Sequence, residues 1–302
     1  MISLVTRVRN REEHLLQSIP SWIAEPLVDD IVIVDYGSIK PIAPSILDLS
    51  SKIRLCTVHN TTLWKSAKAI NIGVQWARCP YVLRLDCDIN RVSNLRKYLE
   101  AKTERNFFSG RMAEQSFKAF FGQCLFSKKQ WVEVGGYHEF MVGWGFDDSD
   151  FYERMVEAGH HRELFDIGDL GEIVHSDVAR VAASMPAYEF IRPEVMKDKG
   201  FQMRLNRIIS KLVPWDASFY RPQVLQAASD RHAHVRLDDE TRFEREVVRL
   251  STILCALAEK SPYGGDDRRD MLDGLMNIKL LNRLKWARLL AREVTQSAAP
   301  IF

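Results

Sequence analysis

The segment Leu83-Arg84-Leu85-Asp86-Cys87-Asp88 decides the fold that this sequence predicts. The apolar run from Tyr81 to Leu85 is typical of a buried strand, and two carboxylates follow with one residue between them. Because successive side chains point to opposite sides of an extended backbone, Asp86 and Asp88 are expected to project from the same side. Hard cations such as Mg²⁺ and Mn²⁺ prefer oxygen ligands and keep positions for substrate phosphates. The segment therefore predicts a metal that holds a nucleotide diphosphate.

The residues before this strand alternate between strand and helix patterns. Three short apolar runs are predicted as strands, at residues 2–8, 30–36 and 53–58. Two helices are predicted between the strands, one at residues 67–76 and an earlier one that carries Leu15, Leu16, Ile19 and Trp22. This order predicts an α/β fold with a Rossmann-like mixed sheet flanked by helices. Ligands of such sheets bind at the carboxyl ends of the strands, where the two carboxylates lie.

A second acidic segment, Gly143-Trp144-Gly145-Phe146-Asp147-Asp148-Ser149-Asp150, stands at the start of a predicted helix that continues through Phe151 and Met155. Carboxylates in a first helical turn match the helix dipole, so a charged N-terminus is one interpretation. The neighbouring glycines and tryptophan favour the other interpretation, a site of chemistry. Together the two acidic segments indicate a metal-dependent nucleotide-sugar transferase.

Composition narrows the class of protein. The 302 residues are 46% hydrophobic, enough for a full core, and 42 Lys and Arg against 40 Asp and Glu give no reason to expect nucleic-acid binding. The five cysteines form no Cys-x-x-Cys pair, which fits a reducing cytoplasm. No stretch reaches the 18 or so apolar residues that span a bilayer, so membrane contact would be peripheral.

The composition changes after Val174-His175, and we divide the chain into a domain at residues 1–184 and a mostly helical region at 185–302. Helices are predicted at residues 243–257 and 271–294. The second of these carries leucines among Lys279, Arg283, Lys285, Arg288 and Arg292. It suits peripheral association with an anionic membrane at the inner face of the cell, but a helix packed on its own domain with a solvated basic face is the favoured interpretation.

Two further motifs follow the first two strands. Arg9 and Arg11, in Arg9-Asn10-Arg11, present two guanidiniums that could clasp a diphosphate or nucleoside, although arginines at a helix start are equally common. Asp35, in Asp35-Tyr36-Gly37-Ser38, is expected to be an exposed carboxylate that accepts hydrogen bonds from a base or ribose. Taken alone, that motif indicates only a turn.

In order along the chain, the sequence has Arg9-Asn10-Arg11, Ala67-Lys68 with Asn71 and Gly73, Asp86-x-Asp88, and Gly143-Trp144-Gly145-Phe146-Asp147-Asp148. With these motifs residues 2–180 resemble the β-1,4-galactosyltransferase family and its bacterial capsule-polymerase relatives, which are inverting transferases with the GT-A fold. Phe146 and Asp147 depart from the glycine and glutamate of the family loop, and Ser149 interrupts its acidic run.

The resemblance implies a UDP-sugar donor, a glycan or glycoconjugate acceptor and a Mn²⁺ or Mg²⁺ ion. The residues it implies for the donor are Arg9, Arg11, Asp35, Lys68 and Asp86. Those implied for the metal are Asp88, His175 and Asp86. Asp148 is implied as the general base that takes the proton from the acceptor hydroxyl, and Trp144 and Asp147 as acceptor-binding residues. Glu172 stands where the animal enzymes have a methionine ligand, which should favour Mg²⁺ or Mn²⁺.

Two other functions are compatible with such a sheet. A nucleotidyltransferase would be expected to have a glycine-rich phosphate loop near its N-terminus, but no glycine precedes Gly37. A catalytically silent sugar-binding or scaffold protein is the other alternative, and the intact acidic segment argues against it.

Overall fold

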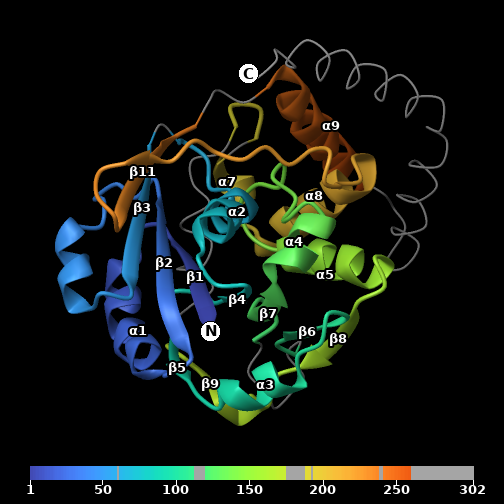
Figure 1. Ribbon diagram of the computed structural model, residues 1–302. Helices are drawn as coiled ribbons and strands as arrows, with labels where there is room; N and C mark the ends of the chain where they lie inside the picture. The colour runs from blue at the N-terminus through green and yellow to red at the C-terminus, as the bar shows by residue number, and fades with distance from the viewer. Residues whose placement is uncertain (60, 112–119, 175–187, 192, 238–240, 260–302) are drawn as a thin grey trace, which may run out of the picture.

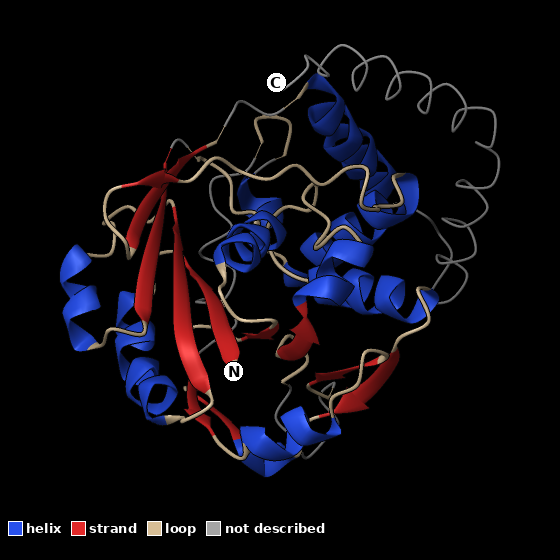
Figure 2. Ribbon diagram, viewed as in Figure 1, coloured by secondary structure: helices blue, strands red, loops and turns tan. Residues whose placement is uncertain are grey.

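A nine-stranded sheet with helices on both faces forms the body of the molecule in a computed structural model (Figures 1 and 2). The model describes residues 1–59, 61–111, 120–174, 188–191, 193–237 and 241–259. In sheet order the strands are β10 (Gln226–Ala227), β11 (His232–Arg236), β3 (Ile53–His59), β2 (Val28–Tyr36), β1 (Ile2–Val8), β4 (Tyr81–Arg84), β7 (Cys124–Ser127), β6 (Asn106–Ser109) and β8 (His161–Leu164). A separate two-stranded sheet pairs β5 (Ile89–Val92) with β9 (Leu170–Glu172).

Helices and short 3₁₀ turns connect these strands. In chain order they are α1 (Glu12–Ala24), η1 (Pro44–Leu49), α2 (Ser66–Trp76), α3 (Leu95–Ala101), α4 (Lys128–Glu133), α5 (Asp147–Glu157), η2 (Ile167–Asp169), α7 (Pro193–Met196), α8 (Lys199–Leu212) and α9 (Arg242–Glu259). The predicted strands and helices of the N-terminal half are confirmed to within two residues at each end, and so is the helix that begins in the acidic segment.

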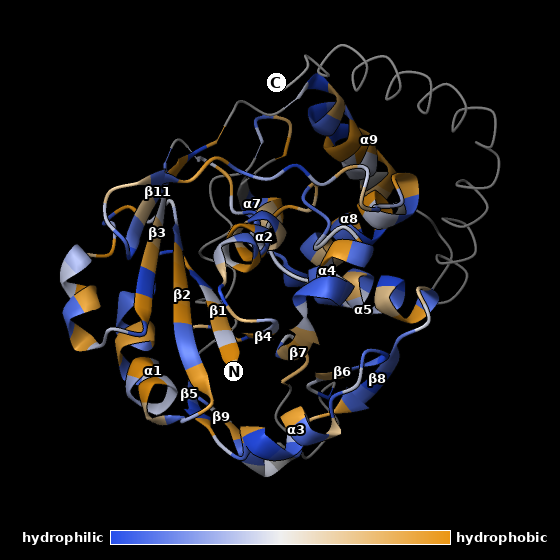
Figure 3. Cartoon of the chain, in the orientation of Figure 1, coloured by the Kyte–Doolittle hydropathy of each residue, from blue (hydrophilic) through white to orange (hydrophobic). Residues whose placement is uncertain are grey.

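The central strands have apolar side chains on both faces because helices cover both. Leu4 and Ile33 share a core cluster with Trp22 of α1, whereas Val5 and Val34 belong to a second cluster with α2, α4 and α5. Figure 3 shows apolar colour over much of β2, interrupted by a hydrophilic stretch, and the hydrophilic colour of the edge strand β8. Continuous apolar runs of this kind are typical of strands buried on two sides.

The strand order reverses between β1 and β4: the chain adds β2 and β3 on one side of β1 and then β4 on the other side. Strand β1 pairs in parallel with β2 on one side and with β4 on the other, and the connections through α1 and α2 lie on opposite faces. A crevice for ligands forms at the carboxyl ends of two such strands. Here Arg7 lies near the end of β1 and Arg9 just beyond it, and Arg84 is the last residue of β4 with Asp86 two residues beyond.

The C-terminal region contributes strands as well as helices. Strand β11 pairs in parallel with β3, so residues 232–236 extend the main sheet. The helix predicted at residues 243–257 is confirmed as α9, and the one predicted at 271–294 lies outside the described residues. Among the helices that are described, none has the length and apolarity needed to cross a membrane. The division into domains at residue 184 stays a prediction.

Asn71 and Gly73, which belong to the motif that begins with Ala67-Lys68 in α2, have structural roles. The Asn71 amide donates to Tyr137 O at 2.8 Å and to Glu139 Oε1 at 2.9 Å, and its oxygen accepts from Tyr137 N at 2.8 Å and Trp131 Nε1 at 3.1 Å. At Gly73 a Cβ atom would lie 2.4 Å from Val5 Cγ1, so only glycine lets α2 approach β1 so closely. These two residues therefore hold α2 against the sheet and against the segment before the acidic residues.

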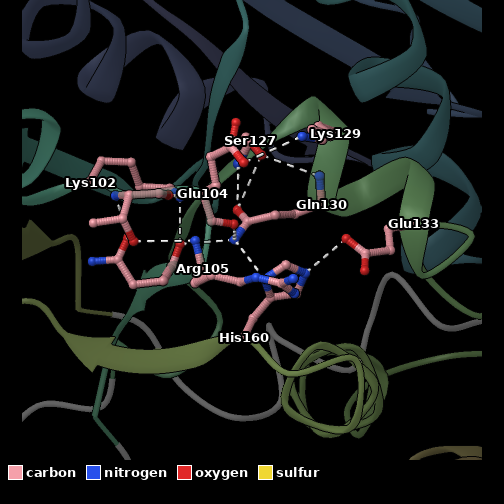
Figure 4. Close-up of polar contacts among 10 residues, drawn as sticks. Lys102, Glu104, Arg105, Ser127, Lys129, Gln130, Glu133 and His160 are labelled. Atoms are coloured by element: carbon pink, nitrogen blue, oxygen red, sulfur yellow. Dashed lines mark hydrogen bonds and ion pairs between the residues drawn. The ribbon is translucent and has the colours of Figure 1, made fainter.

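The far end of α5 is fixed by the polar network in Figure 4. Ser127 and Gln130 form a capping box at the start of α4, and Gln130 Nε2 also donates to Asn106 O at 2.9 Å. The same amide lies 3.2 Å from His160 Nδ1, and His160 Nε2 lies 3.1 Å from Glu133 Oε2. Because His160 lies three residues after the end of α5, this network ties the end of that helix to α4 and β6.

We predict that Asn71→Leu lowers the free energy of unfolding by about 2–4 kcal/mol, because it leaves the Trp131 indole N–H and both backbone groups of Tyr137 buried without a partner. Urea denaturation followed by circular dichroism measures the effect. The matched control is Asn90→Leu at an exposed position of β5, which should change stability by no more than about 0.5 kcal/mol. Equal losses in the two variants would contradict the role given to Asn71.

Candidate active site

The Asp86 carboxylate lies at the end of β4, inside a ring of nitrogen donors. Arg7 forms an ion pair with its Oδ1, Arg84 Nη2 lies 3.3 Å from the same oxygen, and Gln123 Nε2 donates to Oδ2 at 2.9 Å. Burial alone would raise the pKa of Asp86, but the two arginines hold that pKa well below its usual range. Asp86 is therefore ionised at every physiological pH.

Asp88 lies in the turn beyond Asp86 and meets a different arginine. Arg11 Nη1 is 3.4 Å from Asp88 Oδ2, and the backbone oxygen of Asp88 accepts from Ile173 N at 2.8 Å. Pairing of β5 with β9 places Glu172 opposite Ile89, so the chain that leads to His175 runs beside Asp88. His175 itself lies outside the described residues, and its role as a metal ligand stays a prediction.

Helix α1 holds the Asp86-Cys87-Asp88 turn in place. Ser18 Oγ donates to Cys87 O at 3.0 Å, and the indole of Trp22 donates to Ile89 O at 2.8 Å. Both side chains are fully buried, so these bonds are shielded from water. The turn that carries the two carboxylates is thus fixed by the helix before it in the chain.

A buried arginine joins the two acidic segments. Arg84 is 0% exposed, and its Nη2 atom lies 3.3 Å from Asp86 Oδ1 and 3.5 Å from Asp148 Oδ1. Its Nη1 donates to Gly122 O, and a Cβ atom at Gly122 would lie 2.5 Å from Nη1 and 2.9 Å from Asp148 Oδ2. Glycine at 122 therefore leaves the space in which Arg84 and Asp148 meet.

Asp148 has the properties of a group that exchanges protons. Its side chain is 16% exposed, and among the described residues its Oδ1 atom has no hydrogen-bond donor, since Arg84 is close but not aligned. Burial raises the pKa of Asp148 to about 7, against the lowering effect of Arg84 and with help from Asp147. A carboxyl group with a pKa near neutrality is well suited to general acid–base catalysis.

Asp147 is held more tightly than its neighbour. It is 4% exposed, and its Oδ2 atom accepts from Ser66 Oγ at 2.7 Å, while that hydroxyl accepts from Arg7 Nε at 2.9 Å. Through Ser66, Arg7 therefore connects Asp147 to Asp86. The structure brings Asp86, Asp147 and Asp148 together, and the acceptor-binding role of Asp147 stays a prediction.

Arg9, after β1, has hydrogen-bond donors left for a ligand, whereas the carboxylate of Asp35, at the end of β2, already accepts from the backbone. Arg9 is only 6% exposed, and among the described residues just its Nη2 atom has a hydrogen-bond acceptor, Thr62 O at 3.1 Å, leaving Nε and Nη1 buried without one. The prediction that Asp35 is exposed is wrong, because it is 1% exposed and accepts from the backbone N–H groups of Ser38 and Ile42. Asp35 shapes the turn after β2, and its contact with a donor stays a prediction.

Lys68 and Trp144 lie beside the centre of the site. Lys68 Nζ is 3.8 Å from Glu139 Oε2, so its partner in the structure is a carboxylate of the segment before the acidic residues. Trp144 is half-buried, and Lys199 Nζ lies 4.3 Å from the centre of its ring. Trp64 and Trp131 are buried core residues.

The carboxylates of Asp86 and Asp88 suit a hard divalent cation that is bound by the protein and by substrate phosphates together. Within the described ranges, no three His, Cys, Asp or Glu side chains form a group that could hold a metal ion. Mg²⁺ and its analogues are commonly bound by one or two carboxylates together with substrate phosphates, and Asp86 and Asp88 supply that donor chemistry. Three arginines at this point, Arg7, Arg11 and Arg84, balance the carboxylates' charge.

Arg7, Arg84, Ser66 and Gln123 are the site residues that sequence reasoning missed. The strand patterns emphasised apolar residues and gave no role to Arg7 and Arg84 inside them. A charged residue within a strand that is buried on both sides is itself a signal, because it must be paired. Ser66 and Gln123 gave no comparable signal.

Comparison with known proteins agrees with the geometry. Residues 3–113 match the family model described as glycosyl transferase family 2, and residues 108–177 match the model described as the N-terminal domain of galactosyltransferase. The first match includes Asp86 and Asp88, and the second includes the acidic segment. No curated protein sequence matches the chain.

Two solved structures share the architecture. The catalytic domain of Drosophila beta1,4-galactosyltransferase 7 in complex with xylobiose superposes with a TM-score of 0.52 at 14% identity, over 82% of this chain and 98% of that one. A mutant of the same enzyme in complex with manganese, UDP-Gal and xylobiose gives 0.50 at 15% identity over the same shares. The predicted GT-A fold and the predicted resemblance are therefore confirmed.

The raised pKa of Asp148 has a consequence for stability. Since the folded-state pKa is about 7 and the ordinary value is 3.8, this carboxyl destabilises the fold increasingly as pH rises from about 4 to 7. We predict that the free energy of unfolding of Asp148→Asn exceeds that of wild type at pH 8 by about 2–4 kcal/mol, so that the variant unfolds at a higher temperature, and that the gain disappears near pH 4. Calorimetry in EDTA measures it, with Asp166→Asn at an exposed site as control. A variant less stable than wild type at pH 8 would contradict the assignment.

Proposed function

We propose that this GT-A glycosyltransferase moves a hexose or N-acetylhexosamine from a UDP-sugar to a hydroxyl of a glycan or glycoconjugate, with inversion at the anomeric carbon and with a divalent metal. The observation that carries the proposal is the position of Asp148. Asp148, whose carboxyl pKa is near 7, and Asp86, which follows β4, both contact Arg84. A proton acceptor therefore lies next to a place suited to a diphosphate.

The donor half of the site is lined by arginines. Two buried nitrogens of Arg9, Nε and Nη1, have no acceptor in the described chain, and burying such donors costs free energy unless a ligand accepts from them. Arg11, beside Asp88, extends this positive surface. The uridine, ribose and diphosphate oxygens of a nucleotide sugar are acceptors of the required kind, with Asp35 and Lys68 as further donor-binding residues. The manganese and UDP-Gal complex of the Drosophila enzyme supports this class of donor.

Asp86, Asp88 and His175 would hold Mn²⁺ or Mg²⁺. When bound, the ion supplies positive charge to the diphosphate oxygens as the sugar departs. Arg7 and Arg84 keep Asp86 ionised and in place for this role. Arg9 and Arg11 add fixed positive charge where negative charge develops on the leaving group.

Asp148 acts as the general base. The acceptor hydroxyl gives its proton to Asp148 as its oxygen bonds to the anomeric carbon, and the bond from that carbon to the diphosphate oxygen breaks on the opposite face. Attack from the face opposite the leaving group inverts the configuration. Arg84 orients Asp148 through a charge contact at 3.5 Å, and the raised pKa of Asp148 makes it a better proton acceptor than an ordinary aspartate.

Trp144 and Asp147 form the acceptor side of the proposal. A half-buried indole offers a flat apolar face on which the C–H face of a sugar ring can pack, and Asp147 follows it by three residues. The xylobiose in the Drosophila complexes supports a glycan as the class of acceptor.

Two variants separate the roles of the carboxylates. We predict that Asp148→Asn lowers turnover by about 10²–10⁴-fold and leaves metal-dependent donor binding within about twofold of wild type, because only the proton acceptor is lost. Asp88→Ala should lose both turnover and donor binding. Transfer assays and calorimetric titration with the UDP-sugar measure the two quantities, with Asp166→Asn as control. Turnover near wild type in Asp148→Asn would remove it as the base.

The donor is found by measuring thermal stabilisation and slow hydrolysis across a panel of nucleotide sugars with Mn²⁺, Mg²⁺ or EDTA. A metal-dependent response to one UDP-sugar supports the proposal and identifies the sugar. Binding without hydrolysis or transfer would favour a catalytically silent sugar-binding protein. Release of pyrophosphate from a nucleoside triphosphate and sugar phosphate would favour a nucleotidyltransferase.

A further inference from the structure

One face of α8 carries three polar side chains that hold the acidic segment. Gln202, Asn206 and Ser210 are spaced by four residues, so they form a single stripe along the helix. Helix α8 lies against α5, which begins in the acidic segment (Figure 1). The stripe comes from residues outside both matched family segments.

Each member of the stripe bonds to a different point of the segment or of its neighbour Val142. Asn206 Oδ1 accepts from Val142 N at 3.0 Å, and its Nδ2 donates to Gly145 O at 2.7 Å. Gln202 Oε1 accepts from Trp144 N, and Ser210 Oγ donates to Asp150 Oδ1 at 2.6 Å. Gln202 is 0% exposed and Asn206 1%, so water does not compete for these bonds.

The acidic segment needs such support because its backbone is irregular. Gly143, Gly145 and Phe146 are all left-handed, with φ of 73°, 88° and 70°, and Phe146 is not a glycine. In this conformation the N–H groups of Val142 and Trp144 donate to side chains of α8, and not to a strand or a helix turn. A left-handed non-glycine residue persists only where its surroundings fix it.

The glycines of the segment also fit α8. A Cβ atom at Gly143 would lie 2.3 Å from Gln202 Oε1, and one at Gly145 would lie 2.7 Å from Met203 Cγ. The backbone angles favour glycine at both positions, and a side chain at either would also displace Gln202 or Met203 of α8. Lys199, at the start of the same helix, meets the ring of Trp144 between the two glycines.

We propose that Asn206 and Gln202 are positioning residues, which hold the acidic segment in the conformation that presents Asp148 and Trp144. The region after residue 184 then completes the active site and is not an independent appendage. The effect on turnover rests on the proposed function, whereas the effect on the backbone of residues 142–146 does not.

Asn206→Leu removes both bonds to the segment with little change of volume, and Ser210→Ala removes only the bond to Asp150. The control is Ser251→Ala in α9, because Ser251 is as buried as Asn206 but donates only to Val247 O within its own helix. Hydrogen exchange followed by mass spectrometry reports on the backbone, and transfer kinetics with donor-binding titrations report on the site.

We expect the amides of residues 142–146 to exchange at least tenfold faster in Asn206→Leu, while peptides from β1 and β2 keep the wild-type rate. Turnover should fall about 10–100-fold with the donor dissociation constant within about threefold, since a small misplacement of a catalytic group is enough for such a loss. Ser210→Ala should give a smaller effect of the same kind, and Ser251→Ala none.

Unchanged exchange at residues 142–146 in Asn206→Leu would overturn the proposal. So would an increase spread evenly over the sheet, because that would show general destabilisation. If exchange rises locally but the wild-type protein transfers no sugar, the positioning role stands and the proposed function fails. If the wild type is active and Asn206→Leu keeps its turnover, the positioning role fails and the function stands.

Discussion

The site depends on charge compensation by one buried arginine. Two carboxylates that approach from different parts of the chain repel each other, and in a partly desolvated place that repulsion is strong. Arg84 lies between Asp86 and Asp148 and allows both to stay close. The two carboxylates still differ, because Asp86 also has Arg7 and Gln123, whereas burial dominates at Asp148 and the neighbouring Asp147 adds to its effect. The pKa of one is therefore lowered and that of the other raised, which separates an anchoring anion from a proton acceptor.

Each acidic segment is fixed by a helix that is distant from it in the chain. Ser18 and Trp22 of α1 bond to the backbone that carries Asp86 and Asp88, and α8 does the same for the backbone before Asp147. In both places buried side chains satisfy backbone groups that no strand or helix satisfies, so irregular turns acquire the rigidity of the elements around them. Rigid support of this kind is what a catalytic carboxylate requires, because its distance to the reacting atoms must stay fixed.

The local pattern of the sequence predicts the elements of the N-terminal half well, since apolar runs and helical periods report burial directly. It also indicates that the two acidic segments serve one function, and the resemblance implies roles for Asp86 and Asp148 in it. It does not predict Arg84 as their bridge, because that contact depends on the space above Gly122. The burial of Asp35 was missed because a turn signal does not reveal which backbone groups its carboxylate will satisfy. Strand β11 was missed because His-Ala-His-Val-Arg is polar and short, and pairs with residues far away in the chain.

The pairing of β11 with β3 has a consequence for how the chain is made. His59 and His234 bond across this pair at 2.8 Å and are 175 residues apart. At a synthesis rate of 5–20 residues per second, roughly 10–35 s pass between the synthesis of β3 and that of β11, which pairs with it. During that time the open backbone groups of β3 are a template on which another nascent chain can pair. Folding is also slow when contacts are so distant in sequence, because the loop must close before the contact forms. The late strand therefore both completes the sheet and ends the period in which the new protein is most exposed to aggregation.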